Sequence, residues 1–161
     1  MAAALGIGLD VEAPQGNMII DIGGGTTEIA VIALSGIVTD QSIRTAGDEF
    51  TNDIIDYMKR KHNLLIGERT AEEIKIRVGS AVENLENPPD PIGINGRDLL
   101  TGIPKQITTD HTEVAEALDK SIFKIEEAVL KALEATPPEL ASDIYKNGIY
   151  LTGGGAMLRG L

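Results

Sequence analysis

The chain has 161 residues, of which 42% are hydrophobic and 24% charged, and its formal net charge is −11. This make-up is typical of a soluble globular protein with one domain or two small lobes. The acidic balance argues against nucleic acid and anionic lipid as partners, because the longest basic run, residues 59–61, is too short to form a patch. The chain contains no cysteine, which excludes disulfides and thiolate metal sites, and His62 and His111 lack the spacing of metal ligands.

No targeting or membrane-spanning segment stands out. Residues 1–6 lack the basic and apolar regions of a signal peptide, and no stretch reaches the roughly 18 apolar residues of a membrane span. We therefore expect a cytoplasmic protein, and we interpret the sequence as part of a longer chain.

The first elements in chain order are three strands and a helix. Short apolar runs occupy residues 18–22 and 29–34, with glycines after the first, and residues 37–44 follow after the two-residue turn Ser35-Gly36. They predict a three-stranded antiparallel meander. The apolar spacing changes from about two to about 3.6 in residues 48–62, which predicts a helix directly after the third strand.

A second helix and a loop come next. The T-x-x-E pattern of Thr70 and Glu73 has the form of a capping box and predicts the start of this helix. Its apolar face is expected to carry Ile74, Val78, Ala81 and Val82. Gly79 costs about 1 kcal/mol relative to alanine in a helix, which predicts close packing or a ligand contact there. Residues 84–91 contain three prolines and predict a surface loop.

The third part of the chain predicts two strands and a long helix. Residues 92–100 and 103–109 are interpreted as short strands around turns, with Asn95-Gly96 as a favourable hairpin dipeptide. Asp110 with Glu113 predicts an N-cap. Apolar residues then recur at helical spacing and predict a long amphipathic helix, at Val114, Leu118, Ile122, Ile125, Val129 and Leu133.

The last elements surround a second glycine run. Pro137-Pro138 ends the long helix, and residues 139–146 are expected to form a short helical turn. Residues 148–152 predict a buried strand that leads into Gly153, Gly154 and Gly155. A further helix is expected to begin at Ala156.

The link between the first two strands has the composition of a phosphate-binding hairpin. Its three consecutive glycines, Gly23, Gly24 and Gly25, let backbone amides approach an anion without hindrance from Cβ atoms. Asp21, at the end of the first strand, is a candidate to hold a hydrated Mg²⁺ ion. Thr26 and Thr27 are candidates to position a phosphate oxygen or an attacking water. Taken alone, the segment also fits an ordinary glycine-rich hairpin.

The second glycine run strengthens the interpretation. Residues 153–155 follow an apolar strand and precede an expected helix, so their amides could also face a phosphate or a base. Two such loops in one chain of this length favour a nucleotide-binding protein.

Several segments resemble the MreB family of bacterial actin-like proteins, and the resemblance runs through nearly the whole chain. The segments are residues 21–28, 67–75, 137–140 and 151–159. The resemblance implies an ATP-dependent, filament-forming cytoskeletal protein that determines rod shape by organising cell-wall synthesis at the inner face of the membrane. It implies ATP and Mg²⁺ as cofactors of the intact protein, and leaves open whether this chain alone holds them.

The resemblance also assigns roles to individual residues. Asp21 to Thr27 is similar to the second phosphate motif of the family, and Thr152, Gly153, Gly154 and Gly155 are similar to its adenosine loop. Cofactor binding is likewise implied for Glu72, Glu73, Ile74 and Lys75, with Glu72 and Lys75 as ribose and adenine contacts. Without the resemblance, Glu72 fits a first-turn carboxylate that stabilises its helix dipole, and Lys75 fits a solvated surface lysine.

The resemblance further implies that part of the ATPase lies elsewhere. The first phosphate hairpin, the glutamate that activates water and the membrane-inserting elements belong to a missing N-terminal half. We therefore expect the intact protein to be an ATPase and this chain alone to be inactive. Its expected partners are other filament protomers, that N-terminal half, a RodZ-type membrane protein and the cell-wall synthesis machinery, with no nucleic acid and no direct membrane insertion.

The expected fold is α/β: an actin-like ATPase (ribonuclease H-like) subdomain with an inserted smaller α+β subdomain. The first is expected to span residues 1–46 and 110–161, and the second residues 47–109. Filaments are expected in the cytoplasm, associated with the membrane. Two alternatives stay open: a sugar-kinase or heat-shock-chaperone type of ATPase with the same core, and a nucleotide-free module that docks a partner.

Overall fold

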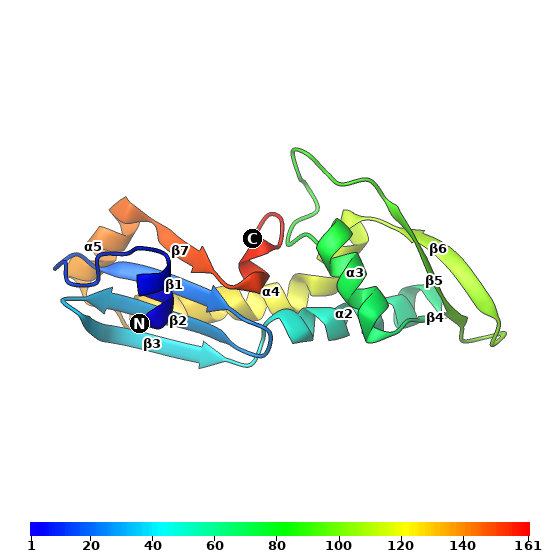
Figure 1. Cartoon of the computed structure of the whole chain (residues 1–161), viewed down its shortest axis with the longest axis horizontal. Helices are drawn as coiled ribbons and strands as arrows, with labels where there is room; N and C mark the ends of the chain where they lie inside the picture. The colour runs from blue at the N-terminus through cyan, green and yellow to red at the C-terminus, as the bar shows by residue number, and fades with distance from the viewer. The chain divides into compact units, whose positions relative to one another are not determined.

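The structure, a computed structural model, describes all 161 residues and divides them into two compact units (Figure 1). Unit 1 contains Met1–Gly47 and Phe123–Ala156, and unit 2 contains Asp48–Ile122 and Met157–Leu161. The boundary between Ile122 and Phe123 falls inside a helix. The units therefore differ from the expected lobes, whose boundaries lie between residues 46 and 47 and between residues 109 and 110.

Unit 1 is built on a four-stranded sheet with the order β3-β2-β1-β7 (Figure 1). Its strands are β1 (Asn17–Ile22), β2 (Thr27–Ala33), β3 (Gly36–Ile43) and β7 (Ile149–Thr152). The first three pair antiparallel, which confirms the predicted meander, and β7 pairs parallel to β1.

Strand β1 lies in the middle of this sheet and has buried residues on both faces. Met18, Ile19, Ile20 and Ile22 are each at most 4% exposed. On one face, Ile19 packs with Ile32 and with Ala4 of the short helix α1 (Ala2–Gly6). A strand covered on both faces reads as a continuous apolar run, which explains why the sequence of β1 shows little alternation.

Strand β7 was predicted to be buried, and that prediction is wrong. Ile149 and Leu151 are 41% and 42% exposed. The reason is that β7 is an edge strand with β1 as its neighbour on one side. The helix expected at Ala156 is also absent, because the chain instead forms the 3₁₀ turn η1 (Gly154–Met157).

Helix α5 (Pro138–Asn147) confirms the helical segment expected after the prolines. Pro138 occupies the first turn, where the missing amide hydrogen is not needed. The helix packs closely on the chain before β1: a Cβ on Gly16 would lie 2.8 Å from the Cβ of Leu140. The Gly16 amide also donates to the Asp143 carboxylate at 3.0 Å.

Unit 2 combines a three-stranded antiparallel sheet, of order β4-β5-β6, with helices (Figure 1). Its elements are α2 (Gly47–His62), β4 (Leu64–Leu65), α3 (Glu68–Val78), β5 (Ile92–Asp98), β6 (Pro104–Thr109) and the first half of α4 (His111–Glu134). The helices α2 and α4 and the hairpin β5–β6 confirm the predicted elements.

Helix α3 differs from its prediction at both ends. It begins at Glu68 with Gly67 as N-cap and no side-chain cap, so Thr70 lies inside the helix and the capping box is not formed. It ends at Val78, so residues 81 and 82 do not extend its apolar face. Gly79 is closely packed as expected, because a Cβ there would lie 3.0 Å from Leu158 Cδ1.

The hairpin of unit 2 turns at a different place from the one predicted. Asn95-Gly96 lies within β5 and pairs with residues of β6. A Cβ on Gly96 would lie 2.6 Å from the carbonyl oxygen of Leu65, so this glycine allows β4 to approach. The actual turn is held by Asp98, whose carboxylate accepts the amide of Leu100 at 2.7 Å. That bond helps to hold the pKa of Asp98 below its usual range.

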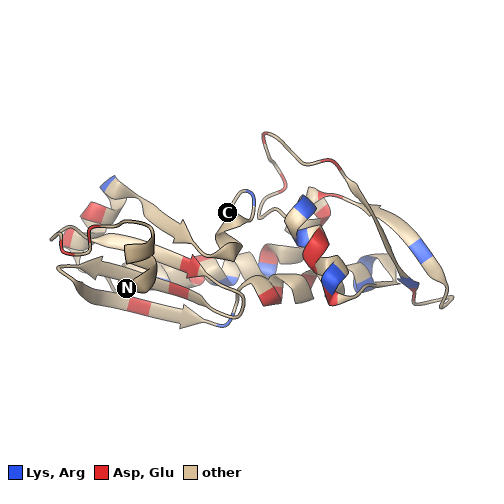
Figure 2. Cartoon of the chain, in the orientation of Figure 1, with Lys and Arg blue, Asp and Glu red and all other residues tan.

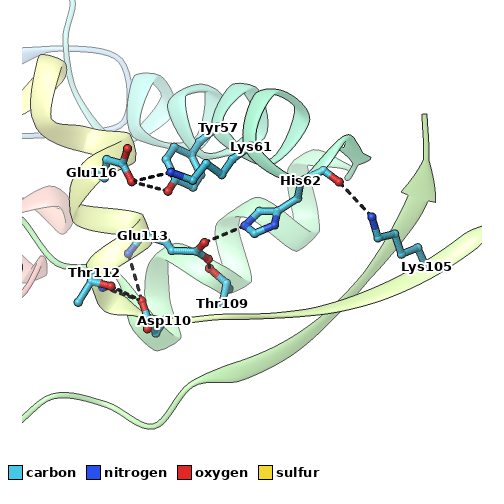
Figure 3. Close-up of polar contacts among 9 residues, drawn as sticks. All are labelled: Tyr57, Lys61, His62, Lys105, Thr109, Asp110, Thr112, Glu113 and Glu116. Atoms are coloured by element: carbon cyan, nitrogen blue, oxygen red, sulfur yellow. Dashed lines mark hydrogen bonds and ion pairs between the residues drawn. The ribbon is translucent and has the colours of Figure 1, made fainter. Parts of the chain in front are cut away.

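Polar contacts join the first half of α4 to α2 (Figure 3). The Tyr57 hydroxyl donates to Glu116 at 2.6 Å, and His62 Nε2 lies 2.8 Å from Glu113 Oε1. Asp110 caps the helix by accepting the Glu113 amide at 3.1 Å, as predicted. These contacts place residues 110–122 with unit 2, whereas the sequence assigned them to the other lobe.

No helix of the chain is long and apolar enough to cross a bilayer.

Candidate functional site

The first glycine run forms the tip of the hairpin between β1 and β2. The Gly23 amide donates to the carbonyl of Thr26 at 2.9 Å and closes a loop of four residues. Gly24, Gly25 and Thr26 are exposed at its tip. The carbonyl of Gly23 accepts the amide of Gly47 at 3.0 Å, which fixes the hairpin to the start of α2. The tip therefore offers exposed backbone on a fixed base.

The two threonines of this hairpin have different environments. Thr26 is exposed at the tip, where its hydroxyl can reach a ligand. Thr27 is fully buried in β2, and its hydroxyl donates to the carbonyl of Thr45 at 2.6 Å. Because its proton is already used, the hydroxyl of Thr27 retains only acceptor capacity. The catalytic role of both residues stays a prediction.

The second glycine run lies directly against the end of β1. Thr152 pairs with Asp21 in the parallel ladder. Gly153 has φ = 85°, and a Cβ there would lie 2.4 Å from the carbonyl oxygen of Ile22 and 2.6 Å from Asp21 Oδ1. A Cβ on Gly155 would lie 2.2 Å from Ile22 Cγ2, so only glycine fits at these two positions.

Unit 1 thus brings the two glycine runs and Asp21 to the same end of β1. A Cβ on Gly154, in contrast, would meet no atom within 4 Å, so the middle of the second loop is open. The structure contains no group of three or more His, Cys, Asp or Glu side chains that could hold a metal. Asp21 alone still fits Mg²⁺, which keeps several waters and is commonly bound through one carboxylate and phosphate oxygens.

Unit 2 contains the other predicted site residues, on α3. Lys75 Nζ lies 2.7 Å from Glu72 Oε2, and the pair is joined by Thr51 of α2. The Lys75 ammonium holds the pKa of Glu72 below its usual range. Glu73 forms an exposed ion pair with Arg77 at 3.2 Å.

Ile74 differs from its neighbours on α3. It is fully buried, so its side chain belongs to the core of unit 2 and only its backbone could meet a ligand. Charges of both signs follow one another along α3 (Figure 2), as expected for the solvated face of a helix whose other face is apolar. The cofactor roles assigned to residues 72–75 stay predictions.

Two residues next to these sites were missed by sequence reasoning. Thr45 accepts the Thr27 hydroxyl, and Thr51 contacts both members of the Glu72–Lys75 pair. Neither lies in a recognisable motif. The contacts of Thr51 join residues 21 and 24 positions apart in the chain, and only the packing of α3 on α2 reveals them.

The mixed sheet, with two glycine loops that meet at the end of β1, agrees with the actin-like fold that the resemblance implied. The chain matches the family described as MreB/Mbl protein over residues 1–161. The chain therefore belongs to the MreB/Mbl family.

Individual relatives agree with this assignment. The chain is 50% identical to the cell shape-determining protein Mbl of Bacillus subtilis over 159 residues, which are 99% of this chain and 47% of the relative. It is 50% identical to the cell shape-determining protein MreB of Escherichia coli over 161 residues, which cover 100% of this chain and 46% of that relative. The chain thus spans about half the length of the curated relatives it matches.

Solved structures agree with the fold. The crystal structure of MreB5 of Spiroplasma citri bound to AMPPNP matches with a TM-score of 0.94 and 45% identity, over 99% of this chain and 47% of that one. The double helical filament of MamK matches with a TM-score of 0.68 and 25% identity, over 89% of this chain and 43% of that one. The expected actin-like α/β fold is confirmed.

Proposed function

We propose that this chain belongs to an ATP-dependent cytoskeletal protein that forms filaments and determines rod cell shape by organising cell-wall synthesis. The proposal is carried by the two glycine loops and Asp21 at the end of β1. It is supported by relatives named as cell shape-determining proteins. It is also supported by similar structures of MreB5 bound to AMPPNP and to ADP.

Each loop has a defined task in this proposal. The exposed amides of residues 24–26 hold phosphate oxygens, which need closely spaced donors with little hindrance from Cβ atoms. Asp21 orients the waters of a Mg²⁺ ion, which when bound neutralises charge on the phosphates. Thr26 positions the attacking water, the buried Thr27 hydroxyl contributes only as an acceptor, and residues 152–155 line the adenosine. Lys75 and Glu72 contact adenine and ribose.

Filament formation is the second part of the proposal. The MamK match is a filament, so the fold is compatible with longitudinal assembly. Unit 1 also exposes large apolar side chains, including Phe123 at 60%, Leu130 at 59% and Tyr145 at 92%. Exposed apolar groups of this kind favour association with another protein surface. We propose cytoplasmic, membrane-associated filaments, with a RodZ-type membrane protein and the cell-wall synthesis machinery as further partners.

We expect this chain to bind ATP and not to turn it over at an appreciable rate. The reason is that the first phosphate hairpin and the water-activating glutamate are expected, from the resemblance to the MreB family, to lie outside these residues. In the whole protein, the γ-phosphate and Mg²⁺ would favour one conformation of the filament subunit, and hydrolysis would weaken its contacts.

The test is a calorimetric titration of the chain with Mg·ATP, repeated with Asp21→Ala, Lys75→Ala and the surface control Lys131→Ala. Lys131 forms an exposed ion pair with Glu127 at 3.8 Å, and removal of its side chain should leave ATP binding unchanged. Binding that is weakened in the first two variants and kept in the control supports the proposal. No binding by the unchanged chain contradicts the proposal that these residues hold ATP, and it favours a nucleotide-free docking module.

A further inference from the structure

The further inference concerns Thr51, a residue of α2 that lies between the two charged side chains of α3. Thr51 is only 4% exposed. Its hydroxyl donates to Glu72 Oε2 at 2.9 Å and accepts from Lys75 Nζ at 3.0 Å. With the Glu72–Lys75 pair at 2.7 Å, the three side chains form a closed triangle.

The hydroxyl group restricts the charged side chains in a way that an ion pair alone does not. Glu and Lys side chains lose much rotamer freedom when they are ordered, and exposed pairs of this kind are usually mobile. Here a buried, β-branched residue with a restricted χ1 angle contacts an atom on each partner. The carboxylate of Glu72, whose side chain is 47% exposed, is thereby held in one orientation at the protein surface.

An oriented carboxylate has a specific use beside a nucleotide. Carboxylates recognise ribose by accepting hydrogen bonds from its hydroxyl groups, and such recognition rejects a sugar that lacks the hydroxyl. We propose that Thr51 is a positioning residue that orients Glu72 and Lys75 for the nucleoside part of ATP and so sets the preference for ribose over deoxyribose. This inference rests on the proposed function.

The test compares Thr51→Val, which keeps the shape and removes the hydroxyl, with Thr51→Ser, which keeps the hydroxyl. The control is Thr39→Val, because Thr39 is also buried and its hydroxyl donates to a backbone carbonyl, that of Ala135 at 3.4 Å, away from α3. Each protein is titrated with the Mg²⁺ complexes of ATP, 2′-deoxy-ATP and tripolyphosphate. Tripolyphosphate reports phosphate binding without a nucleoside.

We expect Thr51→Val to bind ATP about tenfold more weakly, since hydrogen bonds to charged groups are lost. Its ratio of ATP to 2′-deoxy-ATP affinity should move toward one, while its tripolyphosphate affinity should stay as in the unchanged chain. Thr51→Ser should restore both ATP affinity and the ratio to within about twofold. A general loss of structure would instead weaken tripolyphosphate and ATP together, and that result would overturn the inference.

A measurement without nucleotide adds a second criterion. The hydrogen bond from Thr51 helps to keep the pKa of Glu72 low, so a side-chain titration by NMR should show a higher value in Thr51→Val and little change in Thr51→Ser. An unchanged Glu72 titration, or ATP binding by Thr51→Val equal to that of the unchanged chain, would overturn the inference alone. No binding of ATP by the unchanged chain would contradict the proposed function, and the inference with it.

Discussion

The glycine loops of unit 1 and the Thr51–Glu72–Lys75 triangle of unit 2 are two candidate nucleotide contacts of different construction. The loops use backbone, and their fit against β1 depends on the absence of Cβ atoms at Gly153 and Gly155. The triangle uses side chains on two complete helices. Substitutions at Gly153 and Gly155 should therefore damage folding and binding together, whereas substitutions in the triangle should damage binding alone.

The largest effect is expected from Gly153→Ala. A methyl group there would meet the Ile22 carbonyl oxygen, and the backbone has φ = 85°, which L-residues avoid. We expect the free energy of unfolding, measured in urea, to fall by about 2 kcal/mol. ATP affinity should fall with it.

Gly154→Ala is the matched control for this change. A Cβ on Gly154 meets nothing within 4 Å, and its φ is not in the left-handed region. The free energy of unfolding should therefore change by less than about 0.5 kcal/mol. Equal losses in Gly153→Ala and Gly154→Ala would show that the loop is not fitted to β1 as described.

The second prediction concerns Lys75, a member of the triangle in unit 2. Lys75→Met removes the ammonium and keeps the aliphatic stem, and we expect ATP affinity to fall about tenfold because charge-assisted contacts are lost. The free energy of unfolding should change by less than about 1 kcal/mol, since the partner Glu72 is 47% exposed and remains solvated. A urea denaturation in parallel with the ATP titration measures both quantities. A stability loss as large as that of Gly153→Ala would remove the distinction between the two regions.

Asp110 provides a third reference, a side chain that stabilises unit 2 without lying in either site. Its carboxylate accepts the amides of Thr112 and Glu113 at 3.0 and 3.1 Å, and Asp110→Ala should lower the free energy of unfolding by about 1 kcal/mol. The Thr112 hydroxyl and these amides hold the pKa of Asp110 below its usual range.

The sign of the pH effect at Asp110 follows from this lowered pKa. The stabilisation is complete above the unfolded-state pKa of about 3.9 and is lost as the pH falls through the folded-state value. The difference in the free energy of unfolding between Asp110→Ala and the unchanged chain should therefore become smaller at acidic pH. Urea denaturation at several pH values measures it. A difference that stays constant to low pH would rule out the cap as its cause.

The smallest effect is expected from Tyr57→Phe at neutral pH, about 0.5 to 1 kcal/mol for one hydrogen bond to Glu116. Burial, followed by the bond to Glu116, raises the pKa of Tyr57. The protonated form is thus favoured in the folded state. The stabilisation is present below the unfolded-state pKa of about 10 and is lost as the pH rises above it.

Alkaline denaturation measures this effect. The unchanged chain should lose more free energy of unfolding above pH ~10 than Tyr57→Phe does, because only the former must keep a buried hydroxyl protonated. Equal losses of the free energy of unfolding in the two proteins would contradict a stabilising role of the Tyr57 hydroxyl. Neither protein should differ in ATP affinity, since Tyr57 lies in neither candidate site.

Local signals in the sequence predicted the fold well where the decisive contacts are local. The apolar runs of β1 and β2 and the turn before β3 predicted a meander, and Asp110 predicted the cap of α4. The capping box predicted at Thr70 does not form, because α3 already begins at Glu68 and no side chain caps that end of the helix. The turn predicted at Asn95-Gly96 is wrong, because Gly96 lies within β5 and allows β4 to approach.

The candidate site divides in the same way. Glycine runs and an aspartate after a strand are visible in the sequence, and they predict a phosphate site at residues 21–27 and a phosphate or base contact at residues 153–155. The close fit of Gly155 on Ile22 was not predictable, because it depends on a contact between residues more than a hundred positions apart. Thr51 has no motif at all, and its importance follows only from the packing of α2 on α3.

The most direct test of the account is hydrogen exchange of the chain with and without Mg·ATP, read out on peptides from both units. The account predicts slower exchange at residues 21–27 and 152–155, where amides would bind phosphate and adenosine, and also at residues 68–78, where α3 would be fixed by its contacts with the nucleoside. Unchanged exchange in the glycine loops, or protection confined to residues outside these three segments, would contradict it.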